Sequence, residues 1–368
     1  MTNIIKKVLK ENPTTILLLA GVLAGIAHFA GWGDTWVFFL AAIGVIPLAG
    51  YIGSATEALA HYTGPKVGGL LNATLGNAAE LIITLVAIRE GLLELVKASI
   101  TGSIIGNLLL VMGMSMLFGG LKHGVQKFDR KQSGNYGVLL VMTILALVIP
   151  SFFGHSLGNV GSIGWTIGVE LLSLGVAGVM IVLYVLGIIY SLKYSGTPIS
   201  AHQETGTQSK PLFSISTAVI VLGVATLGVV LLSELLVSAV EGVVSQFGLS
   251  EFFIGIILIP IVGNVAEHLV AVQSAMKNKM ELSMEISLSS SLQIALFVAP
   301  LLVFISLAMG NPLTLMFNPF ELISLGAAVV IAALVSMDGE SNWLEGAALL
   351  AIYLILGLAF FLLPAVVG

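Results

Sequence analysis

The sequence predicts an all-α polytopic membrane protein with eleven transmembrane helices. Charged residues make up only 9% of the chain and hydrophobic residues 57%, whereas about 25% of the residues in a soluble domain are charged. The mean hydropathy of +1.08 agrees with that composition. In addition, apolar runs of about 20 residues, the length that spans the hydrocarbon core of a bilayer, recur along the chain.

The apolar runs define the expected helices. Three lysines precede the first run, which is long for the core of a signal peptide and is followed by no convincing cleavage site, so we expect a retained first helix. The longest run must tilt or extend beyond the hydrocarbon. In chain order the expected spans are 14–31, 36–60, 66–89, 96–118, 136–152, 163–191, 212–246, 252–276, 283–308, 319–337 and 343–364.

The basic residues predict the orientation. If the N-terminus is cytoplasmic, all fourteen Lys and Arg residues except Arg89 and Lys97 fall on the cytoplasmic side, as the positive-inside rule requires. The protein is therefore expected to be integral to the lipid bilayer, with its N-terminus in the cytoplasm. A net charge of −5 with scattered histidines predicts no nucleic-acid surface.

The order of the spans predicts an inverted repeat. Residues 191–211 form the one clear composition shift, rich in Ser, Thr, Gly and Gln, and are expected to be a cytoplasmic linker. Residues 1–34 hold the first helix, 35–190 a first five-helix repeat and 212–368 a second. Five crossings per half force the two halves into opposite orientations, an arrangement that places substrate sites near the midplane of transporters.

A repeated motif marks the expected site. The segment Gly-Asn-Ala-Ala-Glu at 76–80 returns as Gly-Asn-Val-Ala-Glu-His at 263–268, each within an apolar run. A charged residue at the bilayer centre costs roughly 2.5–3.5 kcal/mol on insertion scales. A lone buried Glu can simply be protonated or bonded to a neighbouring helix, but two copies of the same costly carboxylate favour one composite site.

The repeat extends to both sides of the motif. Ser-Ala-Thr-Glu at 54–57 is echoed by Ser-Ala-Val-Glu at 238–241. Downstream, Gly-Ser-Ile-Ile-Gly-Asn at 102–107 lines up with Ser-Ser-Ser-Leu-Gln at 289–293. Each half therefore offers a helix with a Glu, followed by a helix with Ser and a carboxamide.

These side chains suit a hard cation, which takes about 6–8 oxygen ligands at flexible distances. We expect Glu80 and Glu267 to supply carboxylates. A glycine four residues before each Glu is expected to break the helix and to turn backbone carbonyls toward the ion. Asn77 and Asn264 either ligate the ion or cap the broken ends. These glycines, Gly76 and Gly263, are therefore counted among the candidate ligands. The further candidates, for which interhelical hydrogen bonding is the alternative, are Ser103, Asn107, Ser289, Ser290 and Gln293.

The same two carboxylates explain coupling. When the site is empty and ionised it holds two like charges in a medium of low dielectric constant. Either protons or a divalent cation relieve that cost, so competition between them is the simplest form of antiport.

Four other residues are candidates for access or tuning. Glu57 and Glu241 lie near helix ends and either guide ions toward the site or are simply solvated. His268 follows Glu267 and is a candidate to tune its protonation, although adjacent helix residues face different directions. Glu285 is a candidate access residue. No enzyme is predicted, because the nucleophile-elbow pattern at 154–158 lacks its strand-turn-helix context.

Together the motifs resemble those of the Ca²⁺/H⁺ antiporters of the cation/Ca²⁺ exchanger superfamily. The flanking segments 68–74 and 336–346 are similar to that family as well. The resemblance implies eleven helices with the first outside the repeat, Glu80 and Glu267 as shared Ca²⁺ and H⁺ ligands, and Ca²⁺ as a transported substrate without any cofactor. Family members often carry an acidic stretch between the halves, whereas this linker has only Glu204, and the short N-terminus is typical of microbial forms.

Two alternatives remain open. A Na⁺/Ca²⁺ exchanger has similar architecture but usually more site carboxylates, so the neutral Asn107 and Gln293 argue against it. A passive cation channel is disfavoured by the inverted halves.

Overall fold

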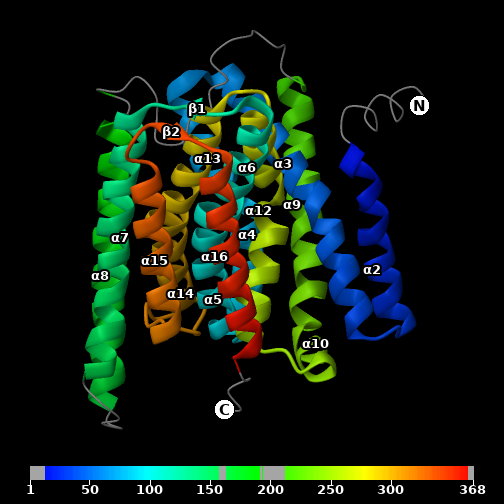
Figure 1. Cartoon of the computed structure of the whole chain (residues 1–368). Coiled ribbons are helices and arrows are strands. Elements are labelled where there is room, and N and C mark those ends of the chain that lie inside the picture. Colours follow the sequence, from blue (N-terminus) through cyan, green and yellow to red (C-terminus); the bar gives the residue numbers. More distant parts are fainter. Residues whose placement is uncertain (1–12, 157–162, 191–192, 194–211, 364–368) are drawn as a thin grey trace, which may run out of the picture.

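The computed structural model describes residues 13–156, 163–190, 193 and 212–363, which form a helical bundle with one short β-pair (Figure 1). The first part of the bundle consists of η1 (Pro13–Leu17), α2 (Leu18–Ala30), α3 (Asp34–Leu75), α4 (Ala78–Arg89), α5 (Leu93–Ile105), η2 (Gly106–Val111), α6 (Met112–His123), β1 (Gln126–Lys127), α7 (Arg130–Ser156) and α8 (Ile163–Tyr190). The second part consists of α9 (Ile215–Ser238), α10 (Val240–Phe247), α11 (Glu251–Phe253), η4 (Ile254–Leu258), α12 (Ile259–Met276), α13 (Met280–Gln293), η5 (Ile294–Val298), α14 (Ala299–Ala308), α15 (Pro319–Val335), β2 (Glu340–Ser341) and α16 (Trp343–Leu362).

The prediction of an all-helical membrane protein is confirmed. Among the described residues, eight helical stretches are long and apolar enough to cross a membrane, and shorter apolar helices occupy Thr14–Ala30 and Pro319–Val335. The predicted span 66–89 falls on two pieces, the end of α3 and the whole of α4. The count of eleven spans and the inverted repeat stay predictions, and most of the predicted linker at 191–211 lies outside the described residues.

A glycine interrupts α3 between two predicted spans. Gly64 interrupts the helix with φ 81° and ψ 172°, a left-handed conformation that glycine adopts at little cost. Pro65 follows and lacks the backbone donor that a continuing helix needs. The chain therefore bends here, and the predicted ends of the spans 36–60 and 66–89 flank that bend.

Three long helices contain a π-helical segment. The segments η2, η4 and η5 interrupt α5–α6, α11–α12 and α13–α14, respectively. Two of them lie at similar places relative to the predicted site serines: η2 begins three residues after Ser103, and η5 begins four residues after Ser290. Such segments occur frequently at functional sites.

The site motif packs on two long helices through small side chains. Ala78 and Ala79 of α4 form a buried cluster with Ala49 of α3 and with Ala225 and Val229 of α9. Small residues at a helix interface let the backbones approach closely. The first turn of α4 is therefore fixed against the α3–α9 pair.

The β-pair joins two loops at one end of the bundle. β1 and β2 are antiparallel, with Gln126 opposite Ser341 and Lys127 opposite Glu340. The pair lies at the opposite end of the bundle from α10 (Figure 1). The loop between α6 and α7 is thereby tied to the loop between α15 and α16.

Candidate cation site

Glu80 lies at a helix start in the centre of the bundle. The helix breaks at Gly76 and Asn77, as the sequence predicts, and Asn77 adopts φ −96° and ψ 18°. Glu80 occupies the third position of α4 and is 0% exposed. The partial positive charge of a helix N-terminus favours a carboxylate there, which offsets part of the cost of burial.

The second motif sits in an unbroken helix. α12 runs from Ile259 to Met276 through both Gly263 and Asn264, so the predicted break at Gly263 is wrong. The irregularity lies earlier, in the π-helical segment η4 and at Pro260, the second residue of α12. Because Pro260 has no backbone donor, it loosens the helix one turn before the motif rather than within it.

The carboxylate of Glu80 is bonded from both halves of the chain. The Ser103 hydroxyl donates to Glu80 Oε1. The Asn264 amide Nδ2 donates to Glu80 Oε2 at 3.3 Å and to Ser103 Oγ at 3.2 Å. Asn264 therefore reaches from the second motif to the carboxylate of the first.

Glu267 has the corresponding serine. Ser290 Oγ donates to Glu267 Oε2 at 2.6 Å. Ser103 follows Glu80 by 23 residues, and Ser290 follows Glu267 by the same 23. The two halves thus build the same carboxylate–hydroxyl pair. They differ in access, because Glu80 is fully buried whereas Glu267 is partly exposed.

Each motif glycine faces the glutamate of the other motif. A Cβ atom added at Gly76 would lie 3.2 Å from Glu267 Oε1, and one added at Gly263 would lie 3.4 Å from Glu80 Cβ. The glycines therefore bring α4 and α12, the two helices that carry the carboxylates, close together. This close approach, rather than a helix break, is what Gly263 provides.

The motif asparagines do not cap helices with their side chains. Asn77 makes no side-chain cap bond to α4, and its Nδ2 instead donates to Gln293 Oε1 at 2.9 Å. Buried Oδ1 atoms of Asn77 and Asn264 have no hydrogen-bond partner, and neither does Nδ2 of Asn107. Unpartnered buried oxygens are costly, and a cation between the motifs is the kind of partner that they fit.

The other predicted residues differ in their contacts and in their exposure. Ser289 Oγ donates to Ile286 O of its own helix at 3.5 Å. His268 is buried on α12, and Glu285 is partly buried on α13. Glu57 on α3 and Glu241 in the first turn of α10 are exposed. Their predicted roles in access or tuning stay predictions.

The donor set consists of two carboxylates with neutral oxygens. Within the described part of the chain, no group of three or more His, Cys, Asp or Glu residues is placed to hold a metal ion. Carboxylate, carboxamide and hydroxyl oxygens are ligands for hard cations. The sequence reasoning missed two features of the site: the bond from Asn264 to Glu80 and that from Asn77 to Gln293. Both hydrogen bonds join residues of different halves, so no local sequence pattern predicts them.

Comparisons with known proteins show the family of this chain. The family model described as sodium/calcium exchanger protein matches residues 33–193 and 217–362. The Ca²⁺/H⁺ antiporter of Synechocystis is 43% identical, over 97% of this chain and 99% of its own. The Ca²⁺/H⁺ antiporter ChaA of Bacillus subtilis is 45% identical, over 95% of this chain and 98% of its own.

Solved structures show the same fold. The structure of native YfkE matches with a TM-score of 0.82 at 41% identity and covers 95% of this chain and 100% of its own. The H⁺/Ca²⁺ exchanger CAX matches with a TM-score of 0.66 at 15% identity over 95% of this chain and 92% of its own, and shows the fold alone. The chain therefore belongs to the sodium/calcium exchanger protein family and, within it, to the group of the Ca²⁺/H⁺ antiporters.

Proposed function

We propose that this protein is a secondary active antiporter that exchanges Ca²⁺ for H⁺ by alternating access, with Glu80 and Glu267 binding either Ca²⁺ or protons. The observation that carries the proposal is the reciprocal site. Each carboxylate accepts a hydrogen bond from a serine 23 residues later, and each glutamate faces the glycine of the other motif. The relatives at 43% and 45% identity are named Ca²⁺/H⁺ antiporters.

The proposed ligands come from four helices. Glu80 and Glu267 would supply carboxylate oxygens, and the unpartnered Oδ1 atoms of Asn77 and Asn264 would supply neutral ones. The hydroxyls of Ser103 and Ser290, together with backbone carbonyls near the glycines, are further candidates. This donor set approaches the 6–8 oxygens that Ca²⁺ takes. Asn107 and Gln293 would act by hydrogen bonding around the site, whereas Ser289 donates to Ile286 O of its own helix.

Coupling follows from charge. Two ionised carboxylates held together away from water repel each other, and their desolvation is costly. A divalent cation or two protons neutralise them equally well, so each loaded form suits passage through the alternating-access cycle. The serine hydroxyls fit both forms, because a hydroxyl donates to a carboxylate and accepts from a carboxylic acid.

The proposed topology comprises a first helix followed by two inverted five-helix repeats, at 35–190 and 212–368. The equal spacing from Glu to Ser in the two halves supports it, as do the similarly placed π-helical segments η2 and η5. The N-terminus is proposed to be cytoplasmic, in a microbial cell membrane.

Transport by inside-out vesicles with an acidic lumen tests the proposed function. Ca²⁺ should accumulate in the lumen as protons leave, and collapse of the pH gradient should stop net uptake. If a Na⁺ gradient alone drove uptake at equal pH, the protein would instead be a Na⁺/Ca²⁺ exchanger. If Ca²⁺ only followed its own gradient under every condition, it would be a passive channel.

A further inference from the structure

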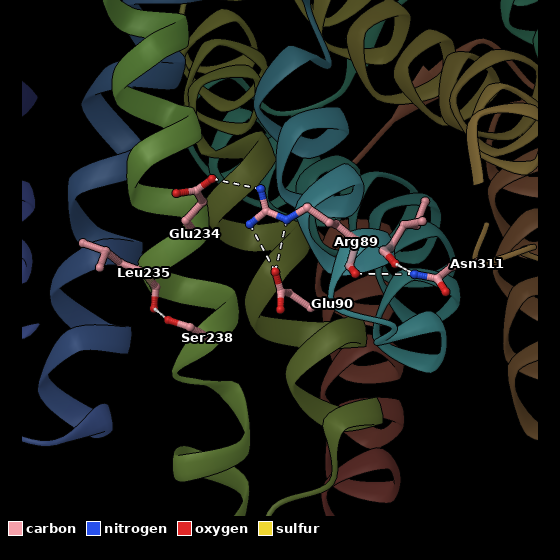
Figure 2. Close-up of polar contacts among 7 residues, drawn as sticks. Arg89, Glu90, Glu234, Leu235, Ser238 and Asn311 are labelled. Atoms are coloured by element: carbon pink, nitrogen blue, oxygen red, sulfur yellow. Dashed lines mark hydrogen bonds and ion pairs between the residues drawn. The ribbon is translucent and has the colours of Figure 1, made fainter. Parts of the chain in front are cut away.

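The carboxylate helix α4 ends against a carboxamide from the second half of the chain. Asn311, in the loop between α14 and α15, donates from Nδ2 to Ile88 O at 2.8 Å and to Arg89 O at 3.4 Å. Figure 2 shows the Asn311 amide directed at these last carbonyls of α4. The last four carbonyls of a helix have no i+4 partner within the helix. Ile88 O accepts from Gly91 N at 3.0 Å in the turn that follows, and Asn311 adds a second donor from the other half of the chain.

The other carboxylate helix ends in the same way. Gln126 of β1 donates from Nε2 to Ala275 O at the end of α12, at 2.9 Å. It is 2% exposed, and its amide also donates to Asn278 Oδ1 at 2.9 Å. A Cβ atom at Gly119 would collide with Gln126 Oε1, so this glycine makes room for the carboxamide.

The two contacts occupy equivalent places in the repeat. Ile88 follows Glu80 by eight residues, and Ala275 follows Glu267 by eight residues. Each carboxamide follows the long helix that carries a site serine: Gln126 comes after α5–η2–α6, and Asn311 comes after α13–η5–α14. The partners are exchanged between halves: Asn311 of the second half holds α4 of the first, and Gln126 of the first half holds α12 of the second.

We call the contact of Asn311 with the end of α4 and that of Gln126 with the end of α12 the two clamps. Further contacts lie beside each clamp. Next to Ala275, Met276 O accepts from Lys122 Nζ and is bonded by His123 Nε2, both at 2.9 Å. Next to Ile88, Arg89 forms ion pairs with Glu90 and Glu234 (Figure 2). β1 lies at one end of the bundle and the loop after α14 at the other (Figure 1), so the clamps act at opposite ends.

We propose that Gln126 and Asn311 are positioning residues for cation exchange: each carboxamide fixes the end of one carboxylate helix against the opposite half and so sets the separation of Glu80 and Glu267. This inference rests on the proposed function. Ca²⁺–oxygen distances fall within 2.3–2.6 Å, and binding groups must be held to about 0.5 Å. A proton needs only one carboxylate, so loss of a clamp weakens Ca²⁺ binding more than proton binding.

The test uses the full-length protein in proteoliposomes, with Gln126→Met and Asn311→Leu, which keep volume and remove the donor. Each should raise the Ca²⁺ concentration for half-maximal uptake by roughly tenfold, the usual effect of losing a partner that orients a ligand, and should change the maximal rate much less. Acid inhibition at fixed Ca²⁺ should move to higher pH. Asn311→Gln, which keeps a donor, should recover part of the loss.

The matched controls replace exposed carboxamides: Gln273→Met on α12 itself and Gln246→Met on α10. Both should behave like the wild type. Folded Gln126→Met and Asn311→Leu proteins with wild-type half-saturation and wild-type acid inhibition would overturn the proposal. Glu80→Gln and Glu267→Gln in the same assay separate the two claims: if they also transport normally, the proposed function itself fails.

If those variants do not fold, amide hydrogen exchange of the wild-type protein tests the two clamps instead. The last turns of α4 and α12 should remain protected both with and without Ca²⁺, because the clamps prevent fraying. Fast exchange of both turns, with the middle of each helix still protected, would contradict the clamps.

Discussion

A carboxylate oxygen of Glu267 lies against the backbone of Gly76, so close that a Cβ atom at Gly76 would come within 3.2 Å of it. The same Cβ atom would lie 2.7 Å from Asn72 O. The relationship is reciprocal, since Gly263 faces Glu80. The segments that carry the two motifs therefore pack closely at these glycines, and the room is tightest at Gly76.

Gly76→Ala is accordingly expected to impair transport strongly. The added methyl must push Glu267 or the end of α3 aside, and misplacement of a binding group by about 1 Å costs up to roughly 100-fold in rate. Initial rates of Ca²⁺ uptake in proteoliposomes measure the effect. Gly50→Ala on α3 is the control, because a Cβ atom there meets nothing within 4 Å. Equal rates for the two variants would contradict the close approach.

The two site serines should be equivalent. Ser103→Ala and Ser290→Ala each remove a hydrogen bond to a carboxylate, and such bonds to charged groups contribute about 1.5–3 kcal/mol. The ionised carboxylate is then less favourable, so Ca²⁺ binding should weaken and acid inhibition should begin at higher pH. Titration of Ca²⁺ uptake at several pH values measures both.

Ser289→Ala is the matched control for that pair, since Ser289 precedes Ser290 but bonds to Ile286 of its own helix. It should change half-saturation little. If Ser289→Ala were as damaging as Ser290→Ala, Ser289 would belong among the ligands.

The sequence predicted the parts of this site that repeat and missed those that join the halves. The two motifs and the serines were visible because duplication preserves their spacing. The break at Gly76 was predicted correctly, but the same reasoning failed at Gly263. A glycine inside a helix costs only about 1 kcal/mol relative to alanine, and close packing against Glu80 offsets it, so α12 continues.

The contacts of Gln126 and Asn311 had no local signal. Each residue lies in a short loop, and each binds a carbonyl more than 100 residues away in sequence. Pairing between separate halves depends on how the helices pack, and hydrophobic periodicity does not encode that. The same holds for the bond between Asn77 and Gln293.

The ion pair of Arg89 with Glu234 should depend on salt. It joins α4 to α9 at 3.1 Å (Figure 2), and the side chains are 53% and 43% exposed. Exposed pairs contribute little and are screened by salt. A double-mutant cycle with Arg89→Gln and Glu234→Gln, read as thermal midpoints, should show a small coupling at low salt that vanishes at high salt. A large coupling that persists at high salt would contradict this expectation.

Single cysteines test the orientation cleanly, because the chain has none of its own. Lys127 on β1 is 80% exposed, and Phe247 is exposed at the end of α10, at the opposite end of the bundle. In intact cells an impermeant thiol reagent should label Phe247→Cys but should label Lys127→Cys only after permeabilisation. The reverse pattern would place the N-terminus outside.

The shared use of Glu80 and Glu267 by Ca²⁺ and protons is tested most directly by proton release on Ca²⁺ binding. Ca²⁺ is added to the purified protein in weakly buffered, mildly acidic solution, and the released protons are measured with a pH indicator. The wild type should bind Ca²⁺ and release protons, whereas the Glu80→Gln/Glu267→Gln double variant should do neither while remaining folded. Ca²⁺ binding without proton release by the wild type, or wild-type release by the double variant, would contradict the account.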